Sequence, residues 1–122
     1  SNCQYIFHLE CKVKPIEHTS KLLEHLSTLR LNSLLSDVTI CATLDGKEFP
    51  SHKAILAWRS PVFAAMFNHE EFAQNRNNRV EIPDVSGPVL EAFLAFIYLG
   101  EVSEVTENST ELRKLVDKVG MI

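Results

Sequence analysis

The spacing of apolar side chains changes near residue 51, from every second residue to a helical spacing, and this change constrains the fold most. Residues 38–44 alternate apolar and polar side chains, and Asp45-Gly46, a pair typical of hairpin turns, separates them from residues 47–49. From Ser51 onward the apolar residues recur at helical intervals. We therefore expect a β-hairpin followed by helices, in the α/β (α+β) class.

Helical patterns account for most of the remaining chain. A first helix begins at Thr19 or Ser20, either of which can serve as its N-cap, and carries a stripe of leucines. Ser60 before Pro61 favours the start of a new short helix, because the first helical turn does not use the N–H that proline lacks. Gly100 can end a later, very apolar helix. Helices are predicted at 19–30, 51–59, 60–67, 86–100 and 108–119, with short strands at 80–82 and 102–105.

The N-terminal residues 1–18 are interpreted as a strand and a linker. Apolar and polar side chains alternate from Tyr5 to Val13, and Lys14-Pro15 ends the pattern. A chain of 122 residues is about one domain long. We therefore assign residues 19–122 to that domain.

The three cysteines, Cys3, Cys11 and Cys41, cannot all pair within one chain, and none stands in a Cys-x-x-Cys spacing. Cys3 and Cys11 share one face of the N-terminal strand and His8 lies on the other, which disfavours a metal site. Buried, reduced cysteines are expected. No signal-peptide pattern precedes them, so the nucleus or the cytoplasm is the favoured location.

Charge and composition exclude several classes of function. The chain has 12 Lys and Arg against 16 Asp and Glu, a net charge of −4, which leaves no general basic surface for nucleic acid or an anionic membrane. The apolar runs are far shorter than the roughly 20 residues of a membrane span. Four glycines permit neither a dinucleotide-binding fingerprint nor a P-loop. His52 next to Ser51 lacks the setting of a catalytic triad and is expected to be hydrogen-bonded at a helix start. The sequence predicts no enzyme, no cofactor and no metal.

Five segments together resemble one family. They read Ser-Asp-Val-Thr-Ile (36–40), Glu-Phe-Pro-Ser-His-Lys-Ala-Ile-Leu-Ala (48–57), Arg-Ser-Pro-Val-Phe-Ala-Ala-Met-Phe (59–67), Val-Glu-Ile-Pro-Asp-Val (80–85) and Phe-Ile-Tyr-Leu-Gly-Glu-Val (96–102). These segments resemble the BTB/POZ domain over residues 20–122, and the most specific run is His-Lys-Ala-x-Leu-Ala-x-Arg-Ser-Pro-x-Phe. The strand at 7–13 also resembles the last strand of a MATH domain, which points to the MATH-BTB adaptors.

The resemblance implies a small mixed sheet flanked by helices, a homodimer, and binding to the cullin-3 scaffold of a ubiquitin ligase. Leucines at i, i+4 and i+7 of a helix can be buried against their own domain or against a partner. Asp37 and Lys53 match a charged pair near the family's dimer interface, or serve as ordinary capping and surface charges. The implied dimer interface consists of Leu22, Leu26, Leu29, Asp37, Lys53 and Ile55.

The implied cullin-binding loop spans residues 68–78 and includes His69, Glu71, Phe72 and Gln74. The family places an apolar residue there, then any residue, then Glu; this chain has Phe72-Ala73-Gln74, so an amide replaces the acid. Phe72 is the only apolar residue of any size in this polar stretch. It either folds back onto the core or serves as an exposed binding hot spot.

Two functions remain open after this comparison. In the first, the domain dimerises and binds cullin-3, while another domain, of the MATH type, holds the substrate to be ubiquitinated. The chain then stops short of a further helix that the family carries. In the second, the domain is the dimerisation module of a transcriptional regulator or cytoskeletal scaffold and binds no cullin. The resemblance implies an adaptor without catalytic activity in either case.

Overall fold

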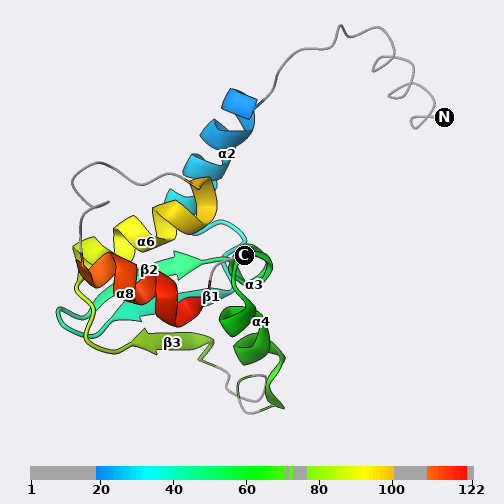
Figure 1. Ribbon diagram of the computed structural model, residues 1–122. Helices are drawn as coiled ribbons and strands as arrows, with labels where there is room; N and C mark the ends of the chain where they lie inside the picture. The colour runs from blue at the N-terminus through cyan, green and yellow to red at the C-terminus, as the bar shows by residue number, and fades with distance from the viewer. Residues whose placement is uncertain (1–18, 71, 73–76, 101–109, 121–122) are drawn as a thin grey trace, which may run out of the picture.

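A three-stranded sheet and five helices make up the described part of the computed structural model, which covers residues 19–70, 72, 77–100 and 110–120 (Figure 1). The strands predicted at 5–13 and 102–105, together with Cys3 and Cys11, lie outside these residues. In chain order the elements are α2 (Thr19–Leu31), β1 (Val38–Ala42), β2 (Lys47–Ser51), α3 (Lys53–Arg59), α4 (Pro61–Asn68), β3 (Arg79–Ile82), α6 (Gly87–Leu99) and α8 (Thr110–Val119).

The sheet has the order β2-β1-β3 and is mixed. β1 and β2 pair antiparallel as the predicted hairpin, and Gly46 in their turn has a φ of 73°, which glycine adopts without a Cβ penalty. β1 and β3 pair parallel, with Thr39 opposite Arg79. A parallel pair needs a crossover, and α3 and α4 provide it.

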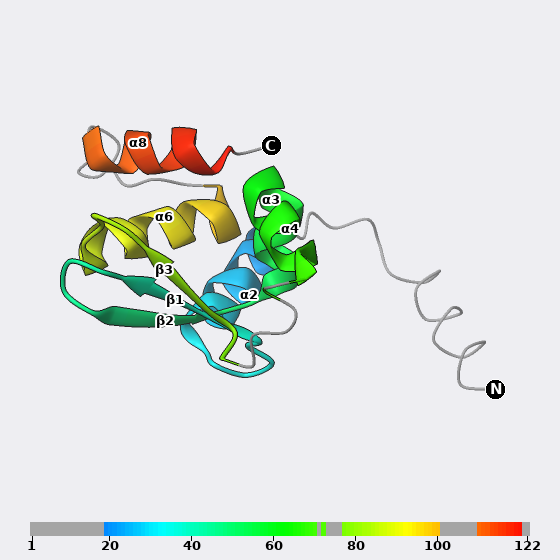
Figure 2. The ribbon, with the colours of Figure 1, turned by 90° about the horizontal axis from the view of Figure 1, so that it is seen from below.

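α6 is the centre of the core, as its apolar faces predicted. Figure 2 shows α6 between the sheet and α8, with α3 and α4 at one end, and α6 contacts elements of each group. Leu90 and Phe93 of α6, Ile40 of β1, Leu56 of α3 and Phe63 of α4 are at most 1 % exposed. Cys41 is also buried, as expected of a small apolar side chain.

The boundary between β2 and α3 lies two residues later than the sequence predicted. β2 continues through Pro50 to Ser51, and α3 begins at Lys53, after the extended residue His52. Pro50 is tolerated because β2 is an edge strand, where the missing N–H breaks no second ladder. Ser51 therefore belongs to the hairpin rather than to the helix.

Side-chain oxygens accept from backbone N–H groups at the N-termini of α4 and α6. Ser60 caps α4 as predicted: its hydroxyl accepts from the Phe63 N–H at 3.3 Å and donates to the Val119 carbonyl at 2.8 Å. Ser86 precedes α6 without a side-chain cap bond, and the Gly87 N–H donates instead to Asp45 Oδ2 at 2.7 Å. Asp45 thus ties the hairpin turn to the start of α6.

Acidification is expected to weaken the hydrogen bond between Asp45 and the Gly87 N–H. Hydrogen bonds from the backbone N–H groups of Gly87 and Lys47 lower the pKa of Asp45 below its ordinary value of 3.8. A carboxylate with a lowered pKa stabilises the fold above its unfolded pKa, and that stabilisation is lost as pH falls through the folded pKa. The thermal midpoint should therefore drop as the pH is lowered below about 4.

The matched variant is Asp45→Asn, which has no carboxylate to protonate. Its thermal midpoint should be lower than that of the unaltered chain at pH 7, and the difference should shrink at pH 3. Calorimetry at both pH values measures this, and an equal difference at the two pH values would contradict it.

Candidate functional site

The apolar stripe of α2 is only partly covered within the chain. Leu29 packs against the core, Leu26 is half-buried, and Leu22 is 57 % exposed. Figure 1 shows why: the first turns of α2 project beyond α6, and its later turns lie against that helix. The N-terminal half of the stripe is therefore open to a partner.

Further apolar side chains are exposed in the turn after α2 and in the last turn of α3. Leu34 and Leu35, in the turn after α2, are 65 % and 81 % exposed, and Trp58 of α3 is 83 % exposed. Leu35 has a φ of 60°, a strained value for a residue with a bulky side chain. The exposure of these three side chains was not predicted from the sequence, although a leucine pair in a polar connection is a visible signal. Exposed apolar side chains in such number are typical of an interaction surface.

Within the single chain, the Asp37 carboxylate and the Lys53 ammonium have different partners. The Asp37 carboxylate is exposed and accepts the Lys53 backbone N–H at 2.7 Å, so it caps α3. The Lys53 ammonium instead donates to Asn78 Oδ1 at 3.0 Å. The capping interpretation therefore describes Asp37. Ile55, two residues further along α3, is half-buried against the core.

Phe72 folds back toward the core. Its ring centroid lies 5.2 Å from that of Phe67, the side chain is half-buried against the core, and the Lys53 ammonium lies 5.3 Å from the ring. Of the two interpretations, the structure favours the anchor over the fully exposed hot spot. His69 is exposed at the end of α4, whereas Glu71 and Gln74 lie outside the described residues.

A Phe72→Ala substitution is accordingly expected to lower the stability of the free domain. Losing a half-buried aromatic side chain and its ring contact should cost about 1 to 2 kcal/mol, less than the roughly 3 to 5 of a fully buried phenylalanine. Urea denaturation measures the difference. An unchanged midpoint would show that Phe72 does not anchor the loop in solution.

His52 and Tyr98 form a buried pair next to the exposed surface. The Tyr98 hydroxyl oxygen accepts from the His52 backbone N–H at 2.9 Å and lies 2.8 Å from its Nδ1. His52 Nε2 lies 3.0 Å from the Leu34 carbonyl oxygen, so the network assigns the proton to Nε2 and makes Nδ1 the acceptor of the Tyr98 O–H. Burial raises the pKa of Tyr98. The predicted role of His52, hydrogen-bonded at a helix start, is confirmed.

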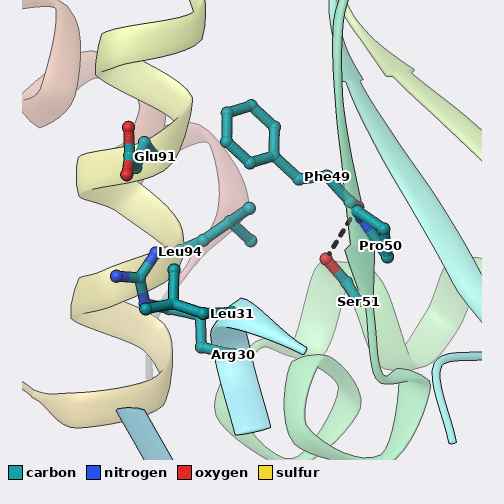
Figure 3. A pocket seen from close by; sticks show the side chains of 7 residues that line it. All are labelled: Arg30, Leu31, Phe49, Pro50, Ser51, Glu91 and Leu94. Carbon is teal, nitrogen blue, oxygen red and sulfur yellow. Dashed lines mark hydrogen bonds between the residues drawn. The ribbon is translucent and has the colours of Figure 1, made fainter. Parts of the chain in front are cut away.

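A small hollow lies between α2, β2 and α6. It encloses about 110 Å³, and Figure 3 shows Arg30 and Leu31 on one side of it and Phe49 on the other. The Ser51 hydroxyl donates to the Phe49 carbonyl at 3.1 Å. Arg30 Nε is buried, with no hydrogen-bond partner among the described residues. The hollow is below the size of ordinary small-molecule pockets.

Comparison with known proteins identifies the family. The family model of the BTB/POZ domain matches residues 26–121. The chain belongs to the BTB/POZ family. It is 40 % identical over 102 residues to the mouse TD and POZ domain-containing protein 5, a match that covers 82 % of this chain and 29 % of that protein. The chain thus spans under a third of the length of this curated relative. This BTB domain is a protein–protein interaction module.

A solved structure confirms the fold. The BTB (Tramtrack and Bric a brac) domain of human Gigaxonin superimposes with a TM-score of 0.65 at 24 % sequence identity, covering 88 % of this chain and 84 % of that one. Within the described ranges, no helix is long and apolar enough to cross a membrane. The same residues bring no group of three or more His, Cys, Asp or Glu side chains together as metal ligands.

Proposed function

We propose that this BTB domain is the homodimerising part of a non-catalytic adaptor, which binds the N-terminal region of cullin-3 in a ubiquitin ligase. Another domain of the same protein, of the MATH type, would hold the substrate, with residues 1–18 as its last strand and a linker. The adaptor would act in the nucleus or the cytoplasm.

The exposed half of the α2 stripe carries the proposal. A helix with an apolar face stabilises a structure by burying that face, and the chain itself covers Leu29 and half of Leu26 but leaves Leu22 exposed. A second copy offers an equally apolar surface, because a two-fold axis brings the same residues of both chains together. In this proposal Leu22, Leu26 and Leu29 of one chain lie against the Ile55 region of the other.

The relative in mouse supports the proposed division of labour. Its name gives it a POZ domain together with a second domain, TD, and the match covers 29 % of its length. An adaptor of this kind uses one surface for itself, one for the scaffold and a separate domain for the substrate. Two residues of the implied cullin-binding loop, Phe72 and Asn78, lie next to α3 through their contacts with Lys53.

Titration calorimetry with the purified N-terminal region of cullin-3 tests the scaffold-binding part. We expect saturable binding by the unaltered chain, and tighter binding by Gln74→Glu, because a carboxylate accepts stronger hydrogen bonds than an amide. Leu44→Asp, in the turn at the far end of the sheet, is the control and should bind as the unaltered chain does (Figure 1). No binding at about 50 µM would contradict the proposal and favour the cullin-independent dimerisation module.

A further inference from the structure

Two residues between α4 and β3, Phe72 and Asn78, contact the same side chain, that of Lys53. The Lys53 Nζ lies 5.3 Å from the ring centroid of Phe72 and 6.0 Å from that of Phe67. The same nitrogen donates to Asn78 Oδ1 at 3.0 Å. Lys53 is itself fixed, because it opens α3 and its backbone N–H donates to Asp37 Oδ1 at 2.7 Å.

Asn78 links this contact to the sheet. It has a φ of 47°, a left-handed conformation that asparagine tolerates better than most residues. Its side-chain oxygen accepts from Lys53, and its backbone oxygen accepts from the Thr39 N–H of β1 at 2.9 Å. Because β3 begins at the next residue, the position of Asn78 determines where β3 meets β1.

The charge of Lys53, and not only its length, is needed for these contacts. An ammonium over the face of an aromatic ring is attracted by the ring quadrupole, and the attraction grows when the group is partly desolvated. Lys53 is half-buried and has two rings and an amide oxygen around its Nζ. Methionine has a similar apolar stem but neither the charge nor a donor.

We propose that Lys53 is a positioning residue that clasps Phe72 and Asn78, two residues between α4 and β3. It holds Phe72 against Phe67 and Asn78 at the start of β3, and so sets in advance the position in which Phe72 meets a protein partner. Preorganisation of this kind lowers the conformational entropy lost on binding. The clasp itself is independent of any partner, whereas its effect on affinity rests on the proposed cullin-3 binding.

NMR of the free domain tests the clasp. The ε-methylene protons of Lys53 should be shifted upfield by the ring current of Phe72, and the shift should vanish in Phe72→Leu. In Lys53→Met, the Thr39 amide should exchange with solvent roughly tenfold faster, the effect of losing one charge-assisted hydrogen bond and a cation–π contact. Lys53→Arg keeps the charge and should exchange within about twofold of the unaltered chain.

Lys47→Met is the matched control, because Lys47 also lies over a phenylalanine ring, at 5.7 Å from Phe49, but in the hairpin. It should leave Thr39 exchange unchanged. Asn78→Gly is a second variant, which accepts the left-handed backbone but removes the side-chain acceptor; it should accelerate Thr39 exchange as Lys53→Met does. Unchanged exchange in both Lys53→Met and Asn78→Gly, or equal acceleration by Lys47→Met, would overturn the clasp.

Titration of the same variants with the cullin-3 N-terminal region separates the two proposals. We expect Lys53→Met to bind the cullin-3 region about fivefold more weakly than Lys53→Arg does, and this result would support the positioning role. Equal affinities, with Thr39 exchange accelerated, would overturn that role and leave the clasp standing. If the unaltered chain does not bind while the NMR effects are present, only the cullin-3 assignment fails.

Discussion

Leu22→Asp is expected to be a monomer under conditions in which the unaltered chain is a dimer. Leu22 is 57 % exposed in the single chain, so the substitution leaves the fold intact. In the proposed dimer the same position is covered by the partner, and an unpaired carboxylate there loses its hydration. The dimer dissociation constant should rise roughly a hundredfold or more.

Leu44→Asp is the matched control for this prediction. Leu44 is 65 % exposed, close to the value for Leu22, but lies in the turn between β1 and β2, away from α2 (Figure 1). Sedimentation velocity over a concentration series measures both variants. A dimer that persists in Leu22→Asp, or one that dissociates equally in Leu44→Asp, would contradict an interface built on α2.

Tyr98→Phe is expected to destabilise the domain strongly for so small a change. The substitution removes one oxygen atom, but it leaves the His52 backbone N–H and Nδ1 without partners in a buried site. Each such group costs about 1 to 3 kcal/mol, so the free energy of unfolding should fall by at least about 2 kcal/mol. Urea denaturation at pH 7 measures this.

Thr43 provides the matched comparison for this prediction. The Thr43 hydroxyl also bridges two groups, donating to the Ile82 carbonyl and accepting from the Asp84 N–H, but at an exposed turn. Water can replace those bonds, so Thr43→Val should cost less than Tyr98→Phe. A loss in Tyr98→Phe no larger than in Thr43→Val would show that burial does not govern the His52 network.

Local signals allowed much of the fold to be predicted from the sequence. The Asp45-Gly46 turn, the Ser60-Pro61 helix start and the end of α6 at Gly100 each depend on neighbouring residues, and all three are confirmed. The side chains that accept from the first backbone N–H of α3 and of α6 could not be predicted in this way. Asp37 and Asp45 cap these helices from far away in the chain, and a cap of that kind has no local signal.

The candidate site was predictable to a smaller extent. The leucine stripe of α2 was visible because it repeats at helical spacing, and the structure shows that its N-terminal part is exposed. The role of Lys53 was not visible in the sequence, because its contacts with Phe72 and Asn78 join residues 19 and 25 positions apart. The family resemblance suggested Asp37 as its partner, whereas two aromatic rings and an amide oxygen surround its ammonium in the single chain. The dimer and cullin assignments remain predictions.

Size-exclusion chromatography with light-scattering detection tests the central claim most directly. The sample is an equimolar mixture of this domain and the cullin-3 N-terminal region. The proposed homodimeric adaptor predicts a single complex with the mass of two domains and two cullin fragments, and a domain peak at twice the mass of one chain when the cullin is omitted. Separate peaks for the domain and the cullin fragment, or a domain with the mass of one chain, would contradict it.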